Sequence, residues 1–124
     1  MKVLLSIKPE FVEKIFSGEK KFEYRRTIFK DDSINTIIVY CTMPIGKVVG
    51  EIKIDEILNL DIESLWDKTK DESGIKYDFF KSYFHDKDFG YAIKFDDVIQ
   101  YDDPINLNEI KEGLRAPQSF CYIE

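Results

Sequence analysis

The sequence predicts an α+β fold in which a mainly antiparallel sheet closes on itself and helices pack against it. Strand-like stretches occur on both sides of helical ones, and turns rather than long crossovers join several neighbouring strands. Of the 124 residues, 44% are hydrophobic and 15% are aromatic, which supplies enough apolar surface for a core. We therefore expect one domain that spans residues 1–124.

The chain opens with a strand and a helix. Residues 3–7 are predicted to form the strand, and Pro9 suits the first turn of the helix because no amide hydrogen is needed there. The apolar residues of this helix recur at helical spacing on one face: Phe11, Val12, Ile15 and Phe16. Gly18 can end the helix in a left-handed conformation.

Three strands are expected next. Residues 21–27 alternate between aromatic and charged side chains, which is typical of a strand with one apolar face. Residues 36–42 are rich in β-branched and apolar side chains and are typical of a central strand. Residues 47–57 return antiparallel, with Gly50 at a bulge or bend.

Two helices and further strands complete the predicted order. The helices cover residues 61–70 and 77–85, where apolar and aromatic side chains recur at helical spacing. Aromatic side chains at this spacing are more typical of a core than of a base-stacking surface. A strand with alternating apolar residues follows at 91–95, and residues 98–101 and 119–123 supply edge pieces.

Several classes of protein do not fit the sequence. The longest apolar run, residues 37–41, is far shorter than the roughly 20 residues that cross a membrane, and residues 1–8 lack a signal-peptide pattern. Cys41 and Cys121 are expected to be buried thiols, and together with His85 they supply too few ligands for a zinc site. We expect a cytoplasmic protein with no metal, no cofactor and no membrane contact.

The net charge of −6 is unevenly distributed. Residues 1–47 carry nine Lys and Arg against six Asp and Glu, a net of +3, whereas residues 48–124 carry nine against eighteen, a net of −9. An acidic chain is poorly suited to strong non-specific binding of nucleic acid. The basic part is either a local anion-binding face or a solvated surface whose asymmetry arose by chance.

The clearest chemical pattern follows the first helix. Gly18 lets the chain turn sharply, which places Lys20 near the start of the next strand. Glu23 and Arg25 are two residues apart and share one face of that strand. A carboxylate beside a guanidinium orients the arginine and leaves donors for a phosphate or a polar base edge. Spacing alone also allows an exposed charge pair on a solvated face.

Residues 18–25, with the sequence GEKKFEYR, resemble the GxKxxExR motif of the ASCH family at all four defined positions. Four further segments look like the family: residues 5–9, 49–51, 72–75 and 116–120. The resemblance covers nearly the whole chain and implies a PUA-like β-barrel with a cleft beside the motif. It also implies RNA or nucleotide-like ligands, and some members of the family are small hydrolases or nucleases.

We therefore expect the protein to bind RNA or a nucleotide-like molecule in a cleft lined by this motif. Such a protein would act in RNA metabolism or in the regulation of transcription or translation. The residues expected to contact the ligand are Lys20, Glu23 and Arg25, together with Lys8, Arg26, Gln118 and Ser119. For the last two, a turn with ordinary backbone bonds is an equally good interpretation.

An enzyme and a protein-binding module are the alternatives. The enzyme would be a metal-independent hydrolase, an amidohydrolase or a nuclease, that uses Lys20 on a modified nucleoside or RNA. In the family branch that deacylates acetylated cytidine, the resemblance implies a Lys at the position of Lys20 and a Thr at the position of Glu23. The hydroxyl group is therefore missing here. The protein-binding module would use the acidic C-terminal part.

Overall fold

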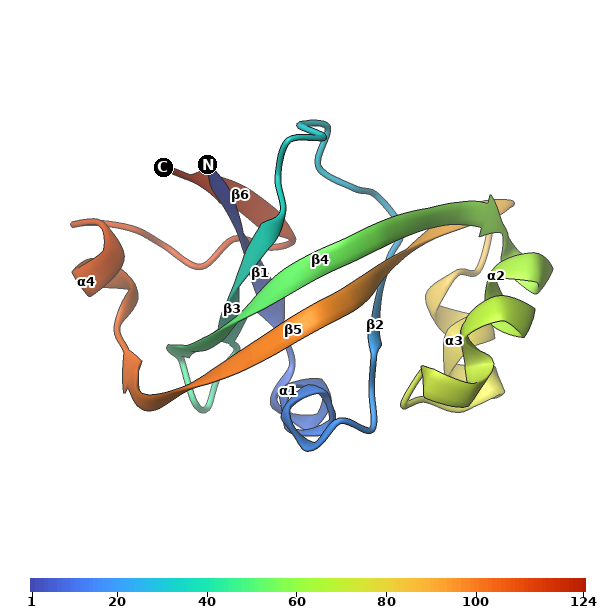
Figure 1. Cartoon of the computed structure of the whole chain (residues 1–124), viewed down its shortest axis with the longest axis horizontal. Helices are drawn as coiled ribbons and strands as arrows, with labels where there is room; N and C mark the ends of the chain where they lie inside the picture. The colour runs from blue at the N-terminus through green and yellow to red at the C-terminus, as the bar shows by residue number, and fades with distance from the viewer.

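The computed structural model describes residues 1–124 and has the predicted α+β architecture (Figure 1). Six strands form one sheet in the order β2-β5-β4-β3-β1-β6. The strands are β1 (Lys2–Ile7), β2 (Phe22–Arg25), β3 (Thr36–Cys41), β4 (Lys47–Asp61), β5 (Phe89–Ile105) and β6 (Phe120–Ile123). The helices are α1 (Pro9–Ser17), α2 (Ile62–Thr69), α3 (Tyr77–Tyr83) and α4 (Leu107–Ile110), and a 3₁₀ turn, η1 (Lys70–Glu72), follows α2.

The sheet is open, so the prediction of a closed barrel is wrong. β1 and β3 are parallel and the other pairs are antiparallel. β2 and β6 lie at opposite edges, and closure would require them to pair along their lengths. β2 has only four residues, and the hydroxyl of Tyr83 donates to its Tyr24 carbonyl at 3.1 Å. A side chain therefore occupies the backbone position where a closing strand would pair.

β4 and β5 form a long antiparallel pair that runs across the molecule, with α2, η1 and α3 between them in the chain (Figure 1). β4 continues past the predicted 47–57 to Asp61, and β5 joins the predicted pieces at 91–95 and 98–101 into one strand. Both strands extend because each offers the other a continuous partner for its backbone groups. A register shift beside Gly50 confirms the predicted irregularity there.

α1 packs against the sheet through its predicted apolar face. The helix runs from Pro9 to Ser17 and is capped by Gly18, whose φ is +86° and whose amide donates to the Ile15 carbonyl at 3.2 Å. Ile15 belongs to the largest buried cluster, which also contains Ile52 of β4 and Ile93 of β5. This contact holds the start of the motif against the sheet.

α2 and α3 connect β4 to β5 and lie together at one end of this antiparallel pair (Figure 1). Leu65 and Phe80 are fully buried there and belong to the same cluster as Phe22 and Tyr24 of β2. α4, which was not predicted, lies near the other end of the β4–β5 pair and begins with a capping box formed by Asn106 and Glu109. None of the helices combines the length and the apolar character needed to cross a bilayer.

Candidate functional site

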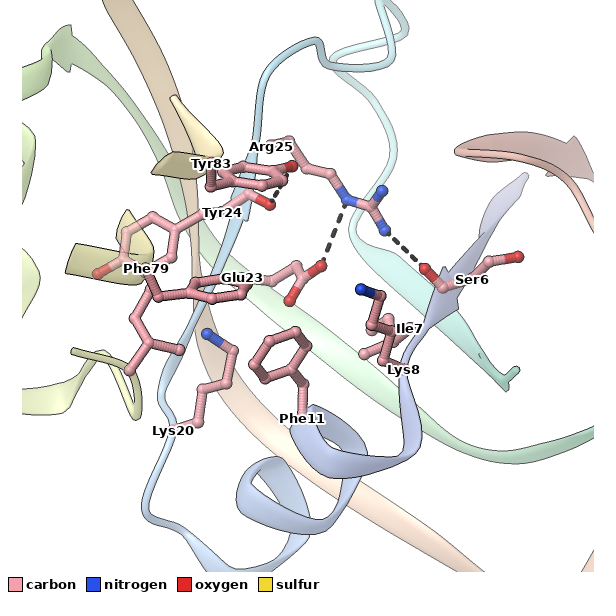
Figure 2. Close-up of a pocket in the computed structure, with 11 residues that line it drawn as sticks. Ser6, Ile7, Lys8, Phe11, Lys20, Glu23, Tyr24, Arg25, Phe79 and Tyr83 are labelled. Carbon is pink, nitrogen blue, oxygen red and sulfur yellow. Dashed lines mark hydrogen bonds and ion pairs between the residues drawn. The ribbon is translucent and has the colours of Figure 1, made fainter. Parts of the chain in front are cut away.

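A cavity of about 180 Å³ opens between α1, β2 and α3 (Figure 2). It brings together the end of β1, the motif segment and the region of α3, which are far apart in sequence. The lining residues are Ser6, Ile7, Lys8, Phe11, Lys20, Glu23, Tyr24, Arg25, Ile75, Phe79 and Tyr83. Six of these eleven are hydrophobic, so the charged groups lie within a partly apolar enclosure.

Backbone contacts and strand alternation place the motif at this cavity. Directly after α1 ends, the amide of Lys20 donates to the Lys14 carbonyl at 3.0 Å. β2 then alternates as expected: Phe22 enters the core beneath α2 and α3, whereas Glu23 and Arg25 line the cavity. Both charged residues are nevertheless buried, which the sequence did not predict.

Lys20 is buried although it carries an ammonium group. The residue is 3% exposed, its Nζ donates to the Ser73 carbonyl at 3.0 Å, and Nζ lies 4.9 Å from the centroid of the Tyr24 ring. Burial lowers the pKa of Lys20 below its ordinary 10.5, while the carboxylate of Glu23 raises it and the ammonium of Lys14 lowers it further. A cation stripped of water in this way gains strongly from an anionic or polar ligand.

The chain opposite Lys20 approaches it very closely. Lys14 donates through Nζ to the Gly74 carbonyl at 2.8 Å, which ties this segment to α1. Gly74 has a φ of +68°, and a Cβ at this position would lie 2.7 Å from the Cβ of Lys20. Residue 74 therefore needs to be glycine both for its conformation and for the space it leaves to Lys20.

Glu23 and Arg25 form a buried ion pair, with 3.4 Å between Arg25 Nε and Glu23 Oε2 (Figure 2). The guanidinium also donates from Nη2 to the Ser6 carbonyl at 3.2 Å and from Nη1 to Ser119 Oγ at 3.4 Å. Arg25 Nε itself is buried without a hydrogen bond. Arg25 thus connects β2 to β1 and to the residue that precedes β6.

Lys8 lies at the rim of the same cavity. It is exposed, immediately precedes α1, and its side chain reaches over the cavity in Figure 2. Unlike Lys20, it keeps its contact with water. The two lysines therefore provide one cation at the entrance and one at depth.

The structure brings together four of the seven predicted site residues and separates the others. Arg26 lies outside the cavity and donates through Nη1 to the carbonyls of Tyr83 and His85, at 2.8 and 3.0 Å. Gln118 is exposed and does not line the cavity. Ser119 reaches the site only through its contact with Arg25.

The aromatic walls were missed as site residues. Phe79 and Tyr83 of α3 were interpreted as core because of their helical spacing, yet both line the cavity. Phe79 is 43% exposed and meets the ring of Phe11 edge-on, with 5.4 Å between centroids. Its position at the margin of the apolar face of α3 was the available signal.

The site combines positive charge with flat apolar walls. Lys8, Lys20 and Arg25 face one carboxylate, that of Glu23, on a chain whose net charge is −6. Opposite charges in one partly apolar cavity suit a polar ring system that also carries an anionic group. Comparison with known proteins gives this geometry a family context.

The profile of the ASCH domain matches residues 5–99. The chain belongs to the ASCH domain family. This ASCH domain is similar to the ASCH domain-containing ribonuclease of Zymomonas mobilis subsp. mobilis, with 30% identity over 125 residues that cover 97% of this chain and 82% of that protein. The matched region includes the whole GxKxxExR motif.

Solved structures agree with the family assignment. A crystal structure of ASCH from Zymomonas mobilis matches this ASCH domain with a TM-score of 0.90 and 28% identity, over 99% of this chain and 87% of that one. The N-terminal domain of McrB from Staphylothermus marinus shares the fold alone, with a TM-score of 0.56 and 11% identity over 91% of this chain and 80% of that one. The α+β architecture is thus that of solved ASCH proteins.

Proposed function

We propose that this ASCH domain binds single-stranded RNA and takes one nucleotide of the strand into the cavity. The observation that carries the proposal is the meeting of a buried lysine, a buried Glu–Arg pair and aromatic walls in one enclosure. Similarity to a ribonuclease supports RNA as the class of ligand.

The size and the walls of the cavity favour one splayed-out nucleotide. A volume of about 180 Å³ is below the roughly 300–1,000 Å³ of pockets that hold drug-sized ligands, so there is room for one ring system. Phe79 and Phe11 present aromatic faces and edges beside the polar groups. Bases that are unpaired can stack on such side chains, whereas bases within a duplex cannot enter.

The charge distribution predicts a specific but moderate affinity. The chain as a whole is acidic, so long-range attraction to a polyanion is weak. Binding must come from a few local contacts, and the dependence of log Kd on log salt concentration should be shallow, with a slope of about one.

A titration of short single-stranded RNA tests this function. Loss of a charge-assisted contact typically costs about 1.5–3 kcal/mol, so Lys20→Ala should weaken binding by about one to two decades. Lys94→Ala is the matched control, because Lys94 is a partly exposed strand lysine that does not line the cavity. Equal losses for both variants with a steep salt slope would indicate diffuse binding, and no RNA binding at all would favour the protein-partner alternative.

A ribonuclease is the second candidate, favoured by the similarity to one over 82% of its length. We propose that Glu23 takes the proton of a ribose 2′-hydroxyl while the new 2′-oxygen–phosphorus bond forms. The bond from phosphorus to the 5′-oxygen breaks, and the ammonium of Lys20 protonates that oxygen. The lowered pKa of Lys20 makes it a better proton donor than an ordinary lysine near neutral pH.

Cleavage of end-labelled RNA with a chelator present tests this candidate. We expect fragments that end in a 2′,3′-cyclic phosphate and a free 5′-hydroxyl, no cleavage at a 2′-deoxy position, and at least a hundredfold slower cleavage by Lys20→Ala. Lys94→Ala should cleave like the wild type. Cleavage that survives in Lys20→Ala would show that the activity does not come from this cavity.

A further inference from the structure

We infer that a nucleotide enters the cavity ring-first: a hydrogen-bond donor of its base or ribose meets the carboxylate of Glu23, and its phosphate stays outside at Lys8. The inference rests on the proposed binding of RNA and deepens it; it does not rest on the ribonuclease candidate, in which a phosphate would lie between Glu23 and Lys20. It assigns Glu23 the role of the group that distinguishes one ligand from another.

The carboxylate of Glu23 lacks the hydrogen bonds that a buried carboxylate normally has. The side chain is 11% exposed, and its close charged partner is Arg25 Nε at 3.4 Å. That contact is an ion pair and not a hydrogen bond, because Arg25 Nε is itself buried without a hydrogen-bond partner. The oxygens of Glu23 are not among the fully buried atoms without a partner, so they face the open cavity, where a carboxylate can accept about four hydrogen bonds in total. Glu23 is therefore an acceptor that awaits donors.

The donors have to come from the cavity. Glu23 lines it, and Figure 2 shows the carboxylate directed into the space between Lys20, Lys8 and Arg25. A bare phosphate at this depth would meet the carboxylate at close range, and the two negative charges would repel each other in an enclosure that screens them poorly. A neutral N–H or O–H group is the matching partner.

The lysines can serve the other polar groups of the ligand. One of the three hydrogens of the Lys20 ammonium is committed to the Ser73 carbonyl, which leaves donors for a ring nitrogen or a carbonyl oxygen. Lys8 is exposed at the rim, where a phosphate can keep part of its hydration and stay away from Glu23. Arg25 is engaged by Ser6 and Ser119 and mainly holds Glu23 in place.

Two parts of a nucleotide can supply the donor: an N–H of the base, or the 2′-hydroxyl of the ribose. The shared chemistry is a neutral donor beside a flat ring, and both sources satisfy Glu23 equally well. Deleting each donor from the ligand separates them without altering the protein.

Calorimetric titration of the wild-type domain with nucleoside 5′-monophosphates provides the main test. The natural nucleotide that binds most tightly is compared with its 2′-deoxy form and with a form whose base N–H is methylated, such as 3-methyluridine for uridine. We expect one of the two deletions to weaken binding about tenfold or more, because the bound ligand then covers the Glu23 carboxylate without donating a hydrogen bond to it. Equal affinity for all three ligands overturns the inference.

Glu23→Gln and Lys8→Ala test the two ends of the ligand. Glu23→Gln keeps the shape, and the ratio of affinities between the complete and the donor-deleted nucleotide should fall toward one, because a neutral amide accepts a weaker bond. Lys8→Ala should weaken the binding of nucleotides and leave the binding of nucleosides unchanged. Lys94→Ala is its control. Thermal unfolding of each variant shows whether it is folded. If Glu23→Gln does not fold, the comparison of the three ligands with the wild-type domain tests the inference alone.

The remaining outcomes distinguish this inference from the proposed function. Tight binding of inorganic phosphate that depends on Lys20 and not on Lys8 would place the anion at depth and overturn the ring-first orientation while leaving RNA binding possible. If the ratio of affinities between the complete and the donor-deleted nucleotide stays the same in Glu23→Gln, only the role of Glu23 is overturned. No binding of any nucleotide or RNA overturns both proposals.

Discussion

At the scale of single residues, the decisive feature is a lysine that the fold buries. Lys20 is almost fully enclosed, and its ammonium has one carbonyl partner, from Ser73, and aromatic neighbours. The cost of its lost hydration is offset in part by the carboxylate of Glu23. Such an arrangement is expected where a ligand supplies the missing contacts, and it makes the stability of the domain depend on pH.

The pH dependence has a definite sign. The pKa of Lys20 is lowered from 10.5 in the folded state, so between the lowered pKa and about 10.5 the unfolded chain binds more protons. Stability due to Lys20 is therefore lost as the pH falls through this window and regained as it rises. We expect the Tm of the wild type to rise relative to Lys20→Met between pH 7 and 10.5. A constant Tm difference across this range would contradict the lowered pKa.

Two glycines allow the contact with Lys20 to be measured. Gly74 and Gly113 both have positive φ, +68° and +78°, but a Cβ at 74 would strike Lys20 whereas a Cβ at 113 would have nothing within 4 Å. Gly113→Ala should cost about 1–2 kcal/mol of unfolding free energy through its backbone conformation alone. Gly74→Ala should cost about 1–3 kcal/mol more, because the clash displaces the neighbour.

Urea unfolding of the two glycine variants provides the stability measurement, and RNA titration gives a second readout. Gly74→Ala should also weaken RNA binding, because it moves Lys20, while Gly113→Ala should bind normally. Equal losses of stability in the two variants would show that Lys20 moves aside at no cost.

At the scale of elements, α3 forms one wall of the cavity and is attached to β2 by a side chain. Arg26 follows β2 directly and donates to the carbonyls of Tyr83 and His85 at the C-terminal end of α3. Carbonyls at a helix end lack partners within the helix, and a basic side chain there also interacts favourably with the helix dipole. Arg26 therefore stabilises the site by capping its wall.

Removing this cap should loosen α3 selectively. We expect Arg26→Ala to lower the unfolding free energy by about 1–2 kcal/mol and to speed amide hydrogen exchange in α3. Asp86→Asn is the control, because it removes the exposed charge that pairs with Arg26 and suits the positive φ of 60° at that position. If amide hydrogen exchange in α3 is unchanged in Arg26→Ala, the cap does not stabilise this helix.

At the scale of the whole molecule, the side chain of Arg25 links the two edges of an open sheet. Arg25 leaves β2, at one edge, and donates to Ser6 of β1 and to Ser119, which precedes β6 at the other edge. The same guanidinium pairs with Glu23. The arginine therefore links the strands that a barrel would join through backbone bonds, and the cavity occupies the space that closure would fill.

A double-mutant cycle tests this link. Removing one member of a buried ion pair typically costs about 3–5 kcal/mol, so Glu23→Ala and Arg25→Ala should each be strongly destabilising. Arg25→Ala should cost more, because it also loses the contacts with Ser6 and Ser119. The double variant should be less destabilised than the sum of the two by about 1–3 kcal/mol in urea unfolding. Additive losses would mean that the pair is not coupled.

The elements that the sequence predicted well are those with a local cause. Helical spacing places α1, and a glycine ends it, so its bounds follow from neighbours within one turn. Alternation places Glu23 and Arg25 on one face of β2 for the same reason. The lengths of β4 and β5 were underestimated because a strand extends for as long as a partner pairs with it, and that partner is remote in sequence.

The sequence by itself determined the motif strand, the helix that precedes it and the α+β class, because their causes lie within a few residues. Tertiary structure alone decided that the sheet stays open, that Arg26 caps α3 and that Phe79 and Tyr83 wall the cavity. The physical reason is distance along the chain. The burial of Lys20, Glu23 and Arg25 depends on segments that reach them only after folding, and burial is what converts three surface-like charges into a candidate site.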